Sequence, residues 1–195
     1  SSSGTSVILT PTAVAALTAA YWKGGLPGYV NEWSASDGSS ASNWTTNQAG
    51  TTPTPLSPGA GATVYISSDV INASPASTVL GANMSVAGVV IQSGSGLGLN
   101  ADGSKLTLGT GGLTMNAGAL ASTVAANVGL GANQTWTNNS SNPLTVSGGL
   151  SGTGNLTVTG ASPVVLSGAS VNTGGVVISS GILSVSSITD SGSSS

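Results

Sequence analysis

Leu144-Thr-Val-Ser-Gly148 recurs twelve residues downstream as Leu156-Thr-Val-Thr-Gly160, and this short phrase decides the fold. Each phrase is a run of β-favouring residues closed by glycine. Looser versions are Leu106-Thr-Leu-Gly109, Val164-Val-Leu166, Val176-Val-Ile178 and Ile182-Leu-Ser-Val185. The runs recur roughly every ten to twelve residues, a spacing typical of an all-β chain built from many short strands.

The turn residues distinguish two all-β architectures. Antiparallel sandwiches use tight turns such as Asn-Gly or Asp-Gly, and the chain offers only Asp37-Gly38 and Asp102-Gly103. A parallel β-solenoid turns at corners where Gly, Ser and Asn accept unusual backbone angles, and it stacks aliphatic side chains in internal ladders. We therefore predict an all-β fold: a parallel β-helix or solenoid of short strands, with an aromatic-rich N-terminal cap region and an extended N-terminal arm.

Composition divides the 195-residue chain into four segments. We predict an extended arm over residues 1–20, an aromatic- and turn-rich cap region over 21–61, the β-solenoid over 62–190 and a flexible tail over 191–195. The arm carries apolar side chains that suit pairing with another chain: Val7, Ile8, Leu9, Val14 and Leu17.

Charge is scarce throughout the sequence. Charged residues form 4% of the chain and the net charge is −3, whereas typical soluble domains contain roughly 25% charged residues. With two lysines and no arginine, the chain lacks the basic surface that nucleic acids or anionic membranes require. It has no run of 18 or more apolar residues to span a membrane. We predict an extracellular or cell-surface protein that binds no nucleic acid and does not insert into a membrane.

Residue types that carry catalysis or bind metals are equally rare. His and Cys are absent, which excludes nucleophilic triads and the usual zinc sites. Glycoside hydrolysis needs two facing carboxylates, and only Glu32 and Asp37 are close in sequence. The stretch Asn100-Ala-Asp-Gly-Ser104 has a single carboxylate, which favours an Asp-Gly turn over a calcium loop. We predict no enzymatic activity, no catalytic residue, no cofactor and no metal site.

Aromatic residues gather in the cap region. They are Tyr21, Trp22, Tyr29, Trp33 and Trp44. Large rings of this kind can plug the end of a narrow solenoid, which is the interpretation we favour. Exposed rings can instead form a patch that contacts a glycan, and this alternative stays open.

Two regions carry a resemblance to a known family. Gly152-Thr-Gly-Asn-Leu-Thr-Val-Thr-Gly160, continuing through Val165 to Val185, resembles the autotransporter-associated β-strand repeat of bacterial passenger domains. The Tyr21-Trp22 start, the Asn43-Trp44 pair and the Leu130-Gly-Ala-Asn-Gln-Thr-Trp136 phrase are similar to the region that precedes such repeats. The resemblance implies a right-handed parallel β-helix, displayed outside the cell, with a structural or adhesive role and no catalytic residues.

The two ends of the predicted solenoid differ. Terminal repeats normally carry polar or bulky caps, but only Thr-Asp and a Ser/Gly tail follow Ile188. An exposed sheet edge is a template for pairing with another chain. We therefore predict a structural subunit of an extracellular filament, a homopolymer in which the arm of one copy completes the sheet of the next. The alternatives are a fragment of a longer passenger rod, and an adhesin or carbohydrate-binding passenger-domain fragment whose partners are surface glycans.

Overall fold

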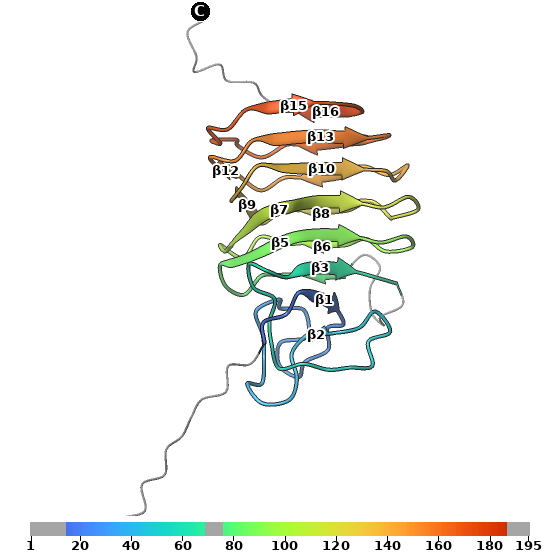
Figure 1. Cartoon of the computed structure of the whole chain (residues 1–195), viewed down its shortest axis with the longest axis vertical. Helices are drawn as coiled ribbons and strands as arrows, with labels where there is room; N and C mark the ends of the chain where they lie inside the picture. The colour runs from blue at the N-terminus through green and yellow to red at the C-terminus, as the bar shows by residue number, and fades with distance from the viewer. Residues whose placement is uncertain (1–14, 69–75, 187–195) are drawn as a thin grey trace, which may run out of the picture.

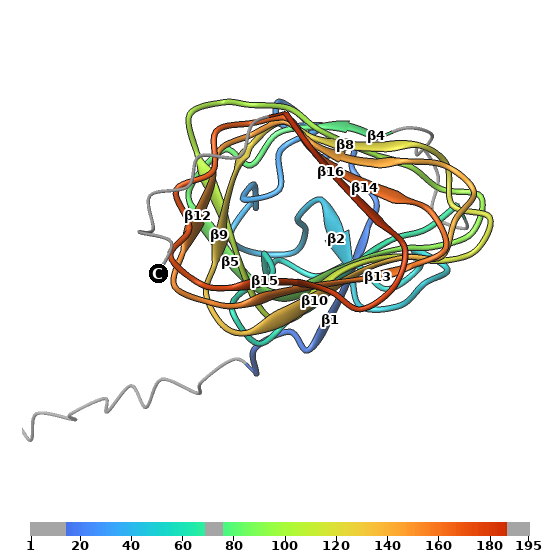
Figure 2. The same cartoon turned by 90° about the horizontal axis from the view of Figure 1, so that it is seen from above.

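The computed structural model describes residues 15–68 and 76–186 of the 195-residue chain. Within these residues every element of regular secondary structure is a β-strand. The strands stack as rungs along one axis (Figure 1), and a view along that axis shows the coils lying over one another (Figure 2). The predicted all-β parallel solenoid is therefore confirmed.

The rungs form two sheets, in which every strand pair except β1–β2 is parallel across the described residues. The ten-stranded sheet consists of β1 (Ala19–Trp22), β2 (Trp44–Thr45), β3 (Thr63–Ile66), β5 (Met84–Ile91), β7 (Lys105–Met115), β9 (Asn127–Leu130), β10 (Gln134–Asn138), β12 (Leu150–Gly152), β13 (Leu156–Gly160) and β15 (Val176–Ile178). The six-stranded sheet consists of β4 (Ala76–Thr78), β6 (Leu97–Leu99), β8 (Ser122–Val124), β11 (Leu144–Val146), β14 (Pro163–Leu166) and β16 (Ile182–Val185).

Stacked inward side chains form the core. Successive residues of a strand point to opposite faces, so each short phrase sends alternate aliphatic residues inside. One column runs in register from β3 to β13 and consists of Val64, Val89, Leu113, Trp136 and Val158. All five side chains are buried. Aliphatic burial on a repeating rung is therefore the main apolar contribution to stability.

The coils shorten along the rod. Register partners are 25 residues apart between β3 and β5, at Val64 and Val89, but 20 apart between β13 and β15, at Val158 and Ile178. Part of the extra length of the longer coils lies in the irregular pairing of β5 with β7. Gly112 lies there with φ +59°, and a Cβ on it would overlap the carbonyl oxygen of Thr135. Close contact between rungs thus requires glycine at this position.

The first coil of the solenoid includes residues that were predicted to belong to the arm. The Thr63 N–H donates to the Thr18 carbonyl at 2.9 Å, and β1 pairs in parallel with β3. The boundary predicted at residue 20 therefore falls inside β1. Leu17, expected to serve assembly, is half-buried against the core of its own chain. The other arm residues, Val7, Ile8, Leu9 and Val14, and the tail 191–195 lie outside the described residues.

Candidate functional site

Three tryptophan rings close the N-terminal end of the rod. Trp22, Trp33 and Trp44 are all buried. The Trp44 ring meets the Trp22 and Trp33 rings edge to face, with centroids 5.0 and 5.2 Å apart, an arrangement that aromatic pairs prefer. The Trp44 indole N–H also donates to the Trp33 carbonyl at 2.7 Å. We call these three residues the tryptophan cap.

Asn43 holds the loop around the cap in place. Its side-chain oxygen accepts the Leu26 N–H at 2.8 Å, and its amide donates to the Glu32 carbonyl at 2.8 Å and to the Tyr29 carbonyl. The backbone oxygen of Asn43 accepts the N–H groups of Lys23 and Gly24. A buried amide satisfied in this way fixes the fold of a loop, because breaking the network leaves polar groups unpaired. The sequence marks Asn43 only by its place in the Asn43-Trp44 pair of the resemblance, so this role was not predicted.

The cap region also covers the sheet edges at this end. Strand β2 lies antiparallel on β1, with Trp22 opposite Trp44. At the edge of the six-stranded sheet, the Trp33 N–H donates to the Val79 carbonyl at 2.9 Å and the Ser34 N–H donates to the Leu80 carbonyl at 3.0 Å. At the N-terminal end the ten-stranded sheet therefore ends in the antiparallel strand β2, and residues 32–34 cover the chain just after β4, which hinders further parallel pairing there.

At the opposite end of the rod, no strand among the described residues covers the last coil. Ile178 continues the inward column above Val158, yet 53% of Ile178 is exposed whereas Val158 is 1% exposed. Val185 stands in the same relation to Leu166 in the other sheet and is 37% exposed. A hollow of about 410 Å³ lies between the two sheets, lined by Leu150, Leu166, Gly168, Ser170, Asn172, Gly174, Val176, Ile178, Leu183 and Val185.

We call the four apolar residues of the last coil that line this hollow the open end. They are Val176, Ile178, Leu183 and Val185. Strand β15 is paired on one side only, with β13, and β16 is paired only with β14 in the described residues. The arrangement is an apolar layer bordered by two free strand edges. A polypeptide that adds further parallel strands would meet both features together.

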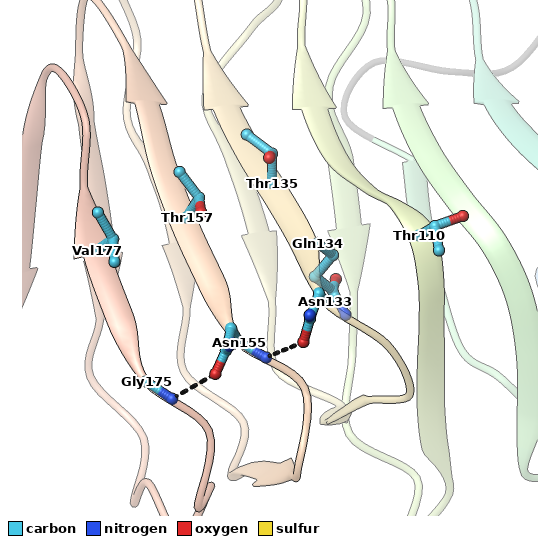
Figure 3. A pocket seen from close by; sticks show the side chains of 8 residues that line it. All are labelled: Thr110, Asn133, Gln134, Thr135, Asn155, Thr157, Gly175 and Val177. Carbon is cyan, nitrogen blue, oxygen red and sulfur yellow. Dashed lines mark hydrogen bonds between the residues drawn. The ribbon is translucent and has the colours of Figure 1, made fainter.

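A shallow groove of about 440 Å³ runs across the outer face of the ten-stranded sheet (Figure 3). Six of its eight lining residues have polar side chains, and the other two are Gly175 and Val177: Thr110, Asn133, Gln134, Thr135, Asn155, Thr157, Gly175 and Val177. Asn133 accepts the Asn155 N–H at 2.9 Å, and Asn155 accepts the Gly175 N–H at 2.8 Å (Figure 3). These amides tie each coil to the next, and the lining contains no charged group that would serve acid–base chemistry.

The described carboxylates are acceptors for neighbouring groups. Hydrogen bonds from the N–H groups of Ala41, Ser39 and Ser40 hold the pKa of Asp37 well below its usual range. Desolvation raises the pKa of Asp102, but hydrogen bonds from Gly81 and Ser104 outweigh it and lower the pKa. The Gly81 contact, at 2.6 Å, links Asp102 to the preceding coil. Asp102 thus lies in a turn and connects two successive coils through its hydrogen bond from Gly81.

The aromatic residues predicted as a cap or a glycan contact separate into two groups. The tryptophan cap is buried, so its rings present no face to a sugar. Tyr21 is half-buried and stacks on Tyr65 at 4.8 Å, and Tyr29 is 57% exposed. The open-end residues were not predicted as a site from the sequence, which marked Val176-Val-Ile178 and Ile182-Leu-Ser-Val185 only as repeats of the strand phrase.

Comparison of the chain with family models, with curated proteins and with solved structures gives no match. In the part of the chain that the structure describes, no helix is long and apolar enough to cross a membrane. Among the same residues, no three His, Cys, Asp or Glu side chains gather where they could hold a metal ion. The fold thus defines the protein as a parallel β-solenoid. The tryptophan cap closes one end, and the open-end residues are at least partly exposed at the other.

Proposed function

We propose that this protein is a structural subunit of an extracellular fibre, and that copies assemble end to end through β-strand complementation. The open end is the observation that carries the proposal. It presents apolar side chains whose register partners in the preceding coil, Leu156, Val158, Val164 and Leu166, are buried, beside two strands with a free edge among the described residues. A further parallel strand with inward aliphatic side chains would cover this surface, and a second copy of the chain contains strands of that type.

The asymmetry of the rod sets the geometry of assembly. One end is closed by the tryptophan cap and by paired strands, and the other end is open. Contacts between two unlike ends are heterologous, and they continue as a filament unless the rotation closes a ring. Head-to-tail addition is therefore the mode that the two ends support.

The magnitude of apolar burial indicates how much of the interface must be backbone pairing. Fully burying a Val or Ile side chain stabilises by roughly 1.5–3 kcal/mol, and Val176, Ile178 and Val185 are about half exposed. Covering them therefore contributes on the order of 2–4 kcal/mol. Association costs about 4–15 kcal/mol in lost freedom. Side chains alone fall short, so an added strand must also form a hydrogen-bonded ladder along a free strand edge of the last coil.

Placement outside the cell rests on chemistry rather than on geometry. The chain has 4% charged residues, no His and no Cys, so its surface is indifferent to redox state and carries few groups that titrate. The resemblance to autotransporter-associated repeats supports the same placement. The adhesin alternative is less well supported, because three of the five aromatic residues proposed to contact a glycan are buried.

Two neighbouring residues of β15 provide a matched test. Ile178 lines the hollow at the open end, whereas Val177 lines the outer groove, and they are 53% and 55% exposed. We expect Ile178→Asp to abolish assembly, because a buried unpaired charge is costly, and Val177→Asp to retain it. Light scattering of the purified full-length chains measures the mass of the assemblies. Equal assembly by both variants would contradict end-to-end growth through the open end.

A further inference from the structure

A strand that extends the ten-stranded sheet at the open end is expected to resemble the last rung, three aliphatic residues followed by a hydroxyl residue. One segment outside the described residues has this pattern. We propose that Val7-Ile8-Leu9-Thr10 of a second copy pairs in parallel with β15. This inference rests on the proposed function and names the partner segment. It commits to one occupant, a second copy of this chain acting in trans.

The match is between residue types at successive positions. The last rung of the ten-stranded sheet reads Val176-Val-Ile-Ser179, and the next-to-last rung of the other sheet, β14 with the residue after it, reads Val164-Val-Leu-Ser167. Each is three aliphatic residues followed by a hydroxyl residue, as is Val7-Ile-Leu-Thr10. Pro11 follows directly. Proline lacks the N–H that a ladder needs and favours an extended residue before it, so a strand donated by this segment would end at Thr10.

The existing register fixes how the strand would lie. Leu156, Thr157 and Val158 of β13 stand beneath Val176, Val177 and Ile178 of β15. The same step places Val7 over Val176, Ile8 over Val177 and Leu9 over Ile178. Because side chains alternate between faces, Val7 and Leu9 then point inward and cover the hollow, while Ile8 points outward beside the exposed Val177.

Reach excludes pairing within one molecule. Thr18 is fixed beside β3 by its hydrogen bond from Thr63, and the path from β1 to β15 crosses six strand intervals, with a seventh to the added strand. Seven intervals of about 4.8 Å amount to roughly 34 Å. Thr10 and Thr18 are eight Cα–Cα steps apart, and at full extension these steps span at most about 29 Å. The segment cannot lie on β15 of its own chain.

The same distance is no obstacle between molecules. The described chain enters the rod at the closed end, and β15 lies at the opposite end (Figure 1). When closed and open ends of two copies meet, the segment that precedes Thr18 in one copy stands next to β15 of the other. Trans pairing therefore follows from head-to-tail contact without rearranging the tryptophan cap.

Disulfide trapping tests the register and the trans geometry together. The chain has no cysteine, so an Ile8→Cys/Val177→Cys variant contains only the designed pair. Adjacent parallel strands place paired Cα atoms about 4.8 Å apart, within the range that a disulfide bridges. We expect a ladder of covalent multimers on a non-reducing gel. Monomers with an internal disulfide, or no cross-linking, would overturn the proposal. Each single variant should stop at dimers, and Ile8→Cys/Thr135→Cys should give no ladder.

Charge substitutions in the full-length chain separate this inference from the proposed function. We expect Val7→Asp and Leu9→Asp to raise the concentration needed for assembly on the order of tenfold or more, and Ile8→Asp to leave it unchanged. If the Val7 and Leu9 variants still assemble and Ile178→Asp does not, the partner segment is wrong while end-to-end growth stands. If the unmodified chain stays monomeric, the proposed function itself fails.

Discussion

Replacing Trp44 with alanine removes the central ring of the tryptophan cap. The side chain is fully buried, contacts Trp22 and Trp33 edge to face, and donates its indole N–H to the Trp33 carbonyl. Truncating a buried tryptophan costs about 3–5 kcal/mol, and leaving the carbonyl unsatisfied adds about 1–3 kcal/mol. We expect a loss of roughly 4–8 kcal/mol, a large part of the 5–15 kcal/mol typical of a domain.

Urea denaturation followed by circular dichroism measures this loss, because the β-sheet signal does not depend on the tryptophan that is removed. Tyr29→Ala is the matched control, since Tyr29 is an aromatic residue of the same region that is largely exposed. A substitution at such a position changes stability by about 0.5 kcal/mol or less. A Trp44→Ala variant that loses under about 1 kcal/mol would refute the cap as the closure of the rod.

Three further predictions follow from single contacts. Gly112→Ala should destabilise by about 1–3 kcal/mol, because its φ is +59° and a Cβ would overlap Thr135, whereas Gly59→Ala has open space and should be near neutral in the same denaturation assay. Asn155→Ala should speed hydrogen exchange of the Gly175 N–H, which then loses its acceptor; unchanged exchange would contradict the amide ladder. Hydrogen bonds from Ala41, Ser39 and Ser40 lower the folded-state pKa of Asp37, so its contribution is present above the unfolded value near 3.9 and lost as pH falls below it. The difference in urea midpoint between the wild type and Asp37→Asn should therefore shrink between about pH 5 and pH 2, and a constant difference would oppose this.

The repeating unit of the fold could be predicted from the sequence because it is local. Phrases such as Leu144-Thr-Val-Ser-Gly148 combine period-two aliphatic residues with a corner glycine, and together these specify a short rung and a turn. The clustering of Trp22, Trp33 and Trp44 within one segment similarly predicted a closed end. Each of these signals lies within a few residues of the feature that it specifies.

Features that depend on coil length could not be predicted in this way. Which residues stack depends on a spacing that changes from 25 to 20 residues along the rod, so the contact of Gly112 with Thr135 carries no local signal. The start of the first coil at Thr18 was missed for a similar reason, since its partner Thr63 is 45 positions away. Exposure at Ile178 equally reflects the absence of a following rung among the described residues rather than its own sequence.

The most direct test of end-to-end growth is cryo-electron microscopy of the purified full-length chain. The proposal predicts unbranched filaments in which rungs spaced about 4.8 Å apart continue across each junction, with the tryptophan cap of one copy beside the open end of the next. Monomeric rods of the 18.4 kDa chain, or filaments whose copies contact side by side with the open ends uncovered, would contradict it.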